Sequence, residues 1–270
     1  MNRSHHMSTI LTIIAMAMTA VGNVSAESLF GIRARSNSEL YSISTASGAT
    51  TILGQTGIFV GDGLAESSSA NSLWAMSGDQ LYSVSTTSGA ATLVRDFANA
   101  FTGNGLAYDP GRGLLYASDY GSGNVYLIVP GTGKFSLLGS GVALHGLAYS
   151  SLRDKLYGVG TNSLYSINVV TGGSSAVGSL GVVFSTGGSG LSYDSQTDVL
   201  YASSRNQTDL YAIDPDIGLA VSVGALGVGA IHGLASVPEP SSSALFVLAG
   251  FSIFLRRRER AKPKPERTRR

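Results

Sequence analysis

The sequence predicts an all-β fold, a five-bladed β-propeller built from four-stranded antiparallel blades. A short motif, Gly-Leu-Ala or Gly-Leu-Ser, recurs five times and starts at Gly63, Gly105, Gly146, Gly190 and Gly233. The steps between copies are 42, 41, 44 and 43 residues. Short apolar runs separated by glycine, proline and aspartate fill each step, as expected of strands joined by tight turns. A period in the low forties is typical of one propeller blade.

The chain begins with a segment that we interpret as a secretory signal helix, residues 1–26. Arg3 precedes an apolar run from Ile10 to Val21, and Val24-Ser25-Ala26 has the small-residue spacing of a signal-peptidase site. A buried N-terminal helix is the alternative. We expect cleavage before Glu27.

The stretch from Gly105 to Gly139 is the clearest copy of the repeat, with the runs GLAY, LLYAS, NVYLIV and KFSLLG. Equivalent second strands are expected to start at Leu29, Leu73, Leu115, Leu156 and Leu200. Third strands are expected at Leu40, Leu81, Val125, Leu164 and Leu210, and fourth strands near Thr50, Thr92, Ser136, Ala176 and Val221. Eleven of the 12 tyrosines fall at repeat positions. Packing between blades explains this recurrence better than an aromatic sugar-binding surface does.

The first blade lacks its own first strand, because no Gly-Leu-Ala precedes Leu29. The fifth motif, Gly233 to Ser236, has no second strand after it. We therefore expect this last strand to complete the N-terminal blade, so that residues 27–236 form one closed propeller without a free edge.

Residues 237–270 read as a sorting signal with a membrane helix. Val237-Pro238-Glu239-Pro240 precedes an apolar run from Ala244 to Leu255, and the cluster Arg256, Arg257 and Arg258 follows it. The run is short for a full span, but adjoining serines extend it, and arginines are the expected cytoplasmic flank.

Charge and cysteine content narrow the possible functions. Residues 27–237 hold 8 Lys/Arg and 14 Asp/Glu, so their net charge is 8 − 14 = −6. Such an acidic body is poorly suited to nucleic acid, which requires basic surface. The chain has no cysteine, which excludes disulfides and thiolate metal sites.

Two resemblances follow from these residues. The C-terminal arrangement of Val237-Pro238-Glu239-Pro240, apolar segment and arginine cluster resembles the PEP-CTERM sorting signal of Gram-negative bacteria. This implies export, transient anchoring in the inner membrane, recognition by an exosortase, and delivery to the cell envelope or outside the cell, often in species that make exopolysaccharide. The stretch GLAYDPGRGLLYASDYGSGNVYLIVPGTG is similar to NHL-type propeller repeats, although that family usually has six blades.

The candidate site is a polar ring at the mouth of the central channel. The residues just before the five motifs are Asp62, Asn104, His145, Ser189 and His232. Equivalent positions on five blades should converge on the axis. His145, His232 and Asp62 could ligate a divalent metal, the one cofactor that the sequence suggests, with a coordination position open to water. Hydrogen bonding of the ring to channel water and carbonyls is the favoured alternative.

Two functions remain open. The first is a non-catalytic binding or structural protein of the cell envelope or exopolysaccharide matrix, with a glycan or protein ligand. The second is a metal-dependent lyase or hydrolase at the central channel. No G-x-S-x-G, H-E-x-x-H or dinucleotide-binding motif is present, and dense acid/base clustering is absent, which favours the first.

Overall fold

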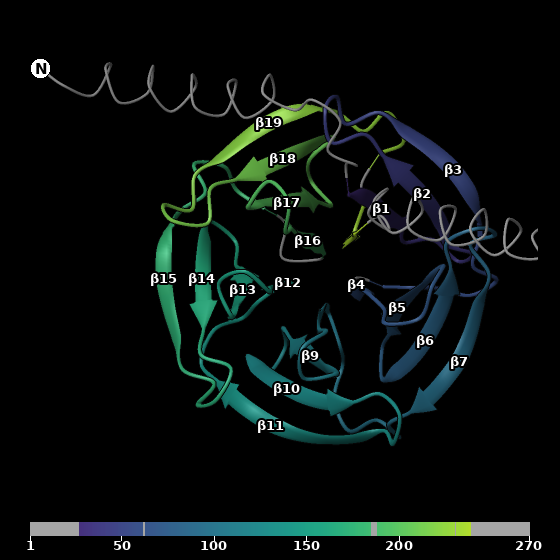
Figure 1. The fold of residues 1–270 in the computed structure, drawn as a ribbon, viewed down its shortest axis with the longest axis vertical. Helices are drawn as coiled ribbons and strands as arrows, with labels where there is room; N and C mark the ends of the chain where they lie inside the picture. The colour runs from purple at the N-terminus through teal and green to yellow at the C-terminus, as the bar shows by residue number, and fades with distance from the viewer. Residues whose placement is uncertain (1–26, 62, 185–187, 230, 239–270) are drawn as a thin grey trace, which may run out of the picture.

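A computed structural model describes residues 27–61, 63–184, 188–229 and 231–238. In this part of the chain, twenty strands form five separate four-stranded antiparallel sheets arranged around a central axis (Figure 1). The predicted five-bladed propeller is confirmed. The predicted signal helix and the C-terminal membrane helix lie outside the described residues.

The strands of each blade are given from the axis outward. Blade 1 comprises β20 (Gly233–Val237), β1 (Ser28–Arg33), β2 (Glu39–Ile43) and β3 (Thr50–Gln55). Blade 2 comprises β4 (Gly63–Glu66), β5 (Ser72–Ser77), β6 (Gln80–Ser85) and β7 (Ala91–Asp96). Blade 3 comprises β8 (Gly105–Asp109), β9 (Leu114–Asp119), β10 (Asn124–Val129) and β11 (Lys134–Ser140). Blade 4 comprises β12 (Gly146–Ser150), β13 (Lys155–Val159), β14 (Ser163–Ile167) and β15 (Ser174–Ser179). Blade 5 comprises β16 (Ser189–Asp194), β17 (Val199–Ser204), β18 (Asp209–Ile213) and β19 (Ala220–Ala225).

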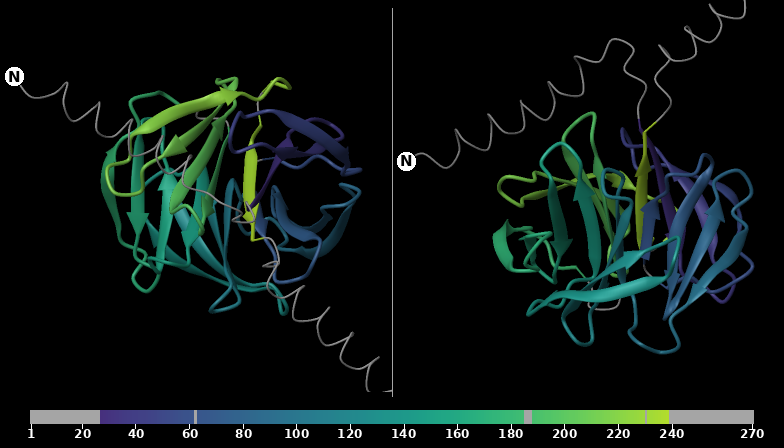
Figure 2. Two further views of the ribbon diagram at one scale, coloured as in Figure 1. Left: turned by 45° about the horizontal axis from the view of Figure 1, so that its top comes forward. Right: turned by 60° about the horizontal axis from the view of Figure 1, so that its bottom comes forward.

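The ring closes through β20, as the sequence predicts. This strand pairs antiparallel with β1, with Leu234 opposite Gly31 and Val237 opposite Ser28. Figure 2 shows the yellow β20 beside the purple β1. The strand extends through Val237, the first residue of the proposed sorting motif, and Pro238 follows it without a backbone N–H to continue the ladder. The two ends of the described chain therefore lie on the same face.

The glycines of the repeated motif allow the innermost strands to touch. A Cβ atom on Gly146 would lie 2.5 Å from the backbone oxygen of Ser189 in the next blade. On Gly105 or Gly190 it would lie 2.8 Å from a backbone nitrogen of the following inner strand. Glycine is required here by close backbone approach, which explains its recurrence at the start of the inner strands.

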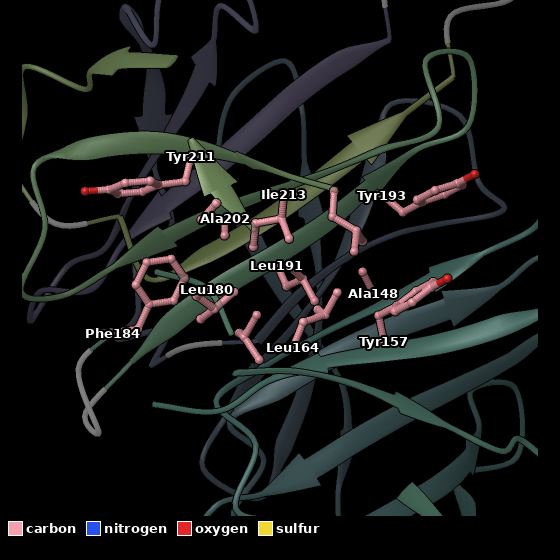
Figure 3. Close-up of a cluster of buried hydrophobic side chains, with 13 residues drawn as sticks. Ala148, Tyr157, Leu164, Leu180, Phe184, Leu191, Tyr193, Ala202, Tyr211 and Ile213 are labelled. Carbon is pink, nitrogen blue, oxygen red and sulfur yellow. The ribbon is translucent and has the colours of Figure 1, made fainter. Parts of the chain in front are cut away.

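Apolar cores fill the spaces between blades rather than one central core. Between blades 4 and 5, for example, Leu164 and Leu180 pack against Leu191 and Ile213. Figure 3 shows Tyr157 and Tyr193 at one end of this cluster, with hydroxyl groups pointing the same way, and Phe184 and Tyr211 at the other end. The predicted role of the repeated tyrosines in packing between blades is thus confirmed for these positions.

The outermost strands meet the next blade at what we call the outer seam. In each blade, the outermost (fourth) strand is shifted in register against the third strand. Beyond this shift, one residue of the fourth strand lies opposite the start of the third; these residues are Gly54, Arg95, Gly139, Gly178 and Gly224. At four of the five seams this glycine contacts a glycine of positive φ in the next blade's turn, the pairs being Gly54 with Gly89, Gly139 with Gly172, Gly178 with Gly218, and Gly224 with Gly48. The seam between blades 2 and 3 departs from this pattern, because it has Arg95.

Among the described residues, no helix has the length and apolar character needed to cross a membrane.

Candidate functional site

The innermost strands all run in one direction along the axis, which gives the propeller two distinct faces. The start face is where they begin, and it carries the predicted ring. The end face is where they finish, at Glu66, Asp109, Ser150, Asp194 and Val237. Because Ser28 pairs with Val237, the ends of the described chain belong to the end face.

The structure describes four of the five predicted ring residues, and Asp62 lies outside the described part. His145, Ser189 and His232 are buried, with 1%, 0% and 8% of their surface exposed. The backbone N–H groups of His145 and His232 donate to carbonyl oxygens of the neighbouring strand, Val159 and Ile32, each at 2.9 Å. All four positions therefore lie where the inner strands begin, and most of the surface of His145, Ser189 and His232 is covered.

The ring side chains contact loops of their own or the adjacent blade. The side-chain amide oxygen (Oδ1) of Asn104 accepts a hydrogen bond from the backbone N–H of Tyr120 at 2.9 Å. The Tyr120 ring stacks on His145 with centroids 4.2 Å apart, and so ties blade 3 to blade 4. Ser189 donates to the Ser204 hydroxyl at 3.1 Å. These contacts hold the loops of the start face together.

The predicted metal site is not tested by this arrangement. Among the described residues, no group of three or more His, Asp or Glu side chains is placed to hold a metal ion. The set His145, His232 and Asp62 includes a residue outside that part of the chain, so it stays a prediction.

An axial cavity of about 30 Å³ runs between the five inner strands. Its wall is formed by the Leu and Ala or Ser positions of the motif, and its mouth on the end face by Glu66, Tyr108, Tyr149, Tyr193 and Ser236. Inside it, Ser192 donates to Ser236 at 2.8 Å. This volume corresponds to about one water molecule. The axis is therefore a packed core with a small opening.

Glu66 lies at this mouth, and Glu27 lies close enough to influence its charge; sequence reasoning missed both. Burial, followed by the charges of Glu27 and Asp109, raises the pKa of Glu66 to about 7. Burial also raises the pKa of Glu27 to about 7, although hydrogen bonds from the Ser195 hydroxyl and backbone N–H partly oppose this shift. Glu66 could have been noticed, because it stands where blades 3, 4 and 5 have tyrosine.

Ionic clamps join neighbouring blades around the end face. Arg112 of blade 3 donates to both carboxylate oxygens of Asp154 in blade 4, at 2.6 and 2.9 Å, and to the Tyr149 hydroxyl at 2.9 Å. Tyr149 in turn donates to Asp154 at 2.6 Å. These bonds lower the pKa of Asp154 to about 2.

The clamp between blades 4 and 5 repeats this pattern. Arg153 donates to both oxygens of Asp198, at 2.8 and 2.6 Å, and also reaches Asp216. Tyr193 donates to Asp198 at 2.6 Å. Bidentate arginine–carboxylate geometry fixes the relative position of the two blades.

Comparison with known proteins identifies the fold and no family. No family model matches the sequence. No curated protein matches it either. A chain in the crystal structure of a nidogen/laminin complex superposes with a TM-score of 0.54 over 80% of this chain and 87% of that chain, at 14% identity. A structural genomics protein of unknown function from Bacteroides thetaiotaomicron VPI-5482 superposes with a TM-score of 0.47, covering 74% and 65% at 16% identity. The first likeness shows a β-propeller.

Proposed function

We propose that this protein is a non-catalytic binding or structural protein of the cell envelope or exopolysaccharide matrix, which uses the propeller as a rigid display scaffold. The observation that carries the proposal is the size of the axial cavity, about 30 Å³ with a wall of small and aliphatic side chains. Ligand pockets typically measure ~300–1,000 Å³, so a substrate has no room on the axis.

The outer surfaces of the blades and their loops are left as the functional surface. The structure in the nidogen/laminin complex supports this use of a propeller, since that chain was crystallised in an assembly of two proteins. Fold likeness alone does not assign a partner to this chain. We expect a glycan or a protein ligand and no nucleic acid, because the net charge of residues 27–237 is −6.

The proposal includes export. Signal peptidase would release residues 1–26, and an exosortase would act at Val237-Pro238-Glu239-Pro240 while the apolar segment and Arg256, Arg257 and Arg258 held the chain in the inner membrane. Both processing sites would flank the end face, because Glu27 and Pro238 adjoin the paired residues Ser28 and Val237. The start face would then point away from the membrane during sorting.

The test has two parts. Intact-mass measurement of the protein from its native host should show loss of residues 1–26 and cleavage near Pro238-Glu239-Pro240; a mass that still extends to Arg270 would argue against sorting. The purified protein should then bind a saccharide or protein from the cell surface saturably and leave it chemically unchanged. Metal-dependent cleavage of that ligand would replace this proposal with the lyase or hydrolase alternative.

A further inference from the structure

The interface between blades 2 and 3 departs from the repeat at four positions. At the outer seam, Arg95 stands where the other blades have glycine. In the clamp, Ala70 stands where blades 3 and 4 have Arg112 and Arg153, each seven residues after the motif glycine. Gly113 replaces Asp154 and Asp198, and Trp74 replaces Tyr116, Tyr157 and Tyr201. Neither the glycine contact nor the ionic clamp can form between these two blades.

A pocket of about 540 Å³ opens at this interface, and we call it the interblade pocket. Its lining includes Trp74, Val94 and Arg95 from blade 2, and Tyr108, Pro130 and the backbone of Gly113 from blade 3. Its volume lies within the range of small-molecule sites, whereas the axial cavity does not. The four departures explain why a pocket exists here. The glycine contact that closes the outer seam at the other four interfaces is absent, and so is the clamp that joins blades 3 and 4 and blades 4 and 5.

Trp74 is less covered than its counterparts, whereas Tyr108 is buried like Tyr193. Trp74 is partly exposed, while Tyr116, Tyr157 and Tyr201 at the same position are 0%, 1% and 5% exposed. The hydroxyl groups of Tyr149 and Tyr193 are held by aspartates of the clamp, but Tyr108 has glycine at the matching place. The pocket thus presents an indole ring, and a phenol that no clamp holds.

Arg95 supplies the one charged side chain of the lining. Among the described residues, ion pairs engage Arg33, Arg112 and Arg153, and none engages Arg95. The Arg95 side chain lies over Gly133, where any Cβ atom would clash with its Cγ, Cδ and Nε atoms. This contact positions the guanidinium at the pocket wall while leaving its charge unneutralised.

We propose that the interblade pocket binds a pyranose ring that carries a single carboxylate, as in a uronic acid residue of a saccharide; this rests on the proposed binding function. The apolar C–H face of the sugar stacks on Trp74, and its hydroxyl groups meet Tyr108 and the backbone of the turns. The carboxylate receives paired hydrogen bonds from Arg95. The acidic body repels a dense polyanion, which favours an isolated carboxylate over a run of them.

Trp74 is the only tryptophan of the chain, so its fluorescence reports on this pocket directly. Full-length protein is titrated with methyl glucuronide, with the neutral methyl glucoside, and with acetate. We expect a saturable change with methyl glucuronide in the millimolar range, at least ~10-fold weaker binding of the glucoside, and no response to acetate, because one charge-assisted pair is worth about a factor of ten or more.

Two variants test the residues. Arg95→Gln should weaken glucuronide binding at least ~10-fold, whereas Arg205→Gln, a change at another exposed arginine, should leave it unchanged. Ala70→Arg combined with Gly113→Asp rebuilds the clamp found between blades 3 and 4 and between blades 4 and 5. It should abolish binding without lowering the melting temperature. Loss of binding in this double variant therefore cannot be attributed to unfolding.

Several results would overturn the assignment. One is the absence of any saturable fluorescence change in folded wild-type protein. Equal affinity for glucuronide and glucoside, or stronger binding of a tripeptide with a free C-terminal carboxylate, would also overturn it. If the chain binds a surface macromolecule while Arg95→Gln has no effect, the interblade pocket is excluded and the general binding function stands. If glucuronide binds but the host does not export the chain, the interblade pocket stands and the proposed function in the cell envelope is excluded.

Discussion

Glu66 lies in an environment that disfavours its charged form. Burial beside Glu27 and Asp109 raises its pKa from 4.5 to about 7, and the pKa of Glu27 moves in the same direction. A carboxyl group whose folded pKa is raised stabilises the fold below the unfolded pKa and loses that contribution as pH rises through the folded pKa. These two groups therefore favour folding at pH 4.5 and oppose it above pH 7.

The expected consequence is a melting temperature that falls by several degrees between pH 5 and pH 8. Glu66→Gln should raise the melting temperature at pH 8 and flatten its dependence on pH. The free energy of unfolding at pH 8 should rise by up to ~3 kcal/mol, since one pKa unit corresponds to about 1.4 kcal/mol. Glu39→Gln, away from the axis, serves as the control. Calorimetry across this pH range checks the prediction, and an unchanged profile in Glu66→Gln would contradict it.

Below pH 4 the carboxylates of the clamps have the opposite effect on stability, because their protonation destabilises the fold. Hydrogen bonds from Arg112 and Arg153 lower the pKa values of Asp154, Asp198 and Asp216. Their contribution is present above the unfolded pKa and is lost as pH falls through the folded values. Together with Glu66 and Glu27, they place the stability maximum near pH 5.

For His145 and His232 we predict a structural role. Both side chains are buried, and His145 stacks on Tyr120, whereas a catalytic metal needs ligands around an open coordination position. Full-length protein dialysed against zinc should retain well under one equivalent by plasma emission. The His145→Ala, His232→Ala double variant should leave that value unchanged and lower the melting temperature. One equivalent of zinc that disappears in the double variant would restore the metal hypothesis.

At the scale of the strand, Gly146 is required for close packing of the inner strands. Alanine there would place its Cβ atom 2.5 Å from the Ser189 oxygen and 2.9 Å from the Leu191 nitrogen, both backbone atoms that cannot move independently. Overpacking of this kind costs about 1–3 kcal/mol. We expect Gly146→Ala to lower the melting temperature by roughly 2–4 °C for each kcal/mol.

Gly173→Ala is the matched control for this experiment. The nearest atom to its added Cβ would be the Thr171 hydroxyl oxygen at 3.5 Å, which is an ordinary contact. Thermal melts of the two variants should therefore differ. Equal melting temperatures would show that the inner strands can separate without loss.

The same scale shows what the sequence could predict. Motif spacing and apolar runs located the strands, because every blade solves the same packing problem with the same residue types. The surroundings of side chains at the axis were harder to predict, because they depend on contacts between distant segments. Glu27 reaches Ser195, 168 residues away, only after the ring has closed. The burial of His145 likewise depends on a loop of the preceding blade, through Tyr120.

The interblade pocket was missed for a different reason. The strand alignment identified what the copies share, whereas the pocket arises where one interface differs at Ala70, Trp74, Arg95 and Gly113. Each of these substitutions alone is an ordinary residue on a turn or strand. Their common location becomes visible only when blades 2 and 3 are placed side by side.

For the whole molecule, five blades impose a narrow axis. The inner strands touch through glycine backbones at the start face, and the remaining axial cavity is about 30 Å³. Differences between blades, rather than the axis, then provide the sites that distinguish this propeller from a symmetric one. This is why both the proposed ligand pocket and the clamps occur between neighbouring blades.

Closure of the ring gives the last prediction. Deleting residues 233–236 removes most of β20, leaves the inner edge of β1 unpaired, and takes away Leu234 and Ala235, which are 1% and 2% exposed. Exposed backbone edges pair with other chains, so we expect a large fall in melting temperature together with aggregation.

The control deletes residues 239–270 and leaves every described strand intact. Light scattering and thermal melts should show this shorter chain to be monomeric and as stable as one that ends at Arg270. A chain without residues 233–236 that stays monomeric and equally stable would mean that blade 1 is complete with three strands. The Gly233 motif would then be dispensable for closure.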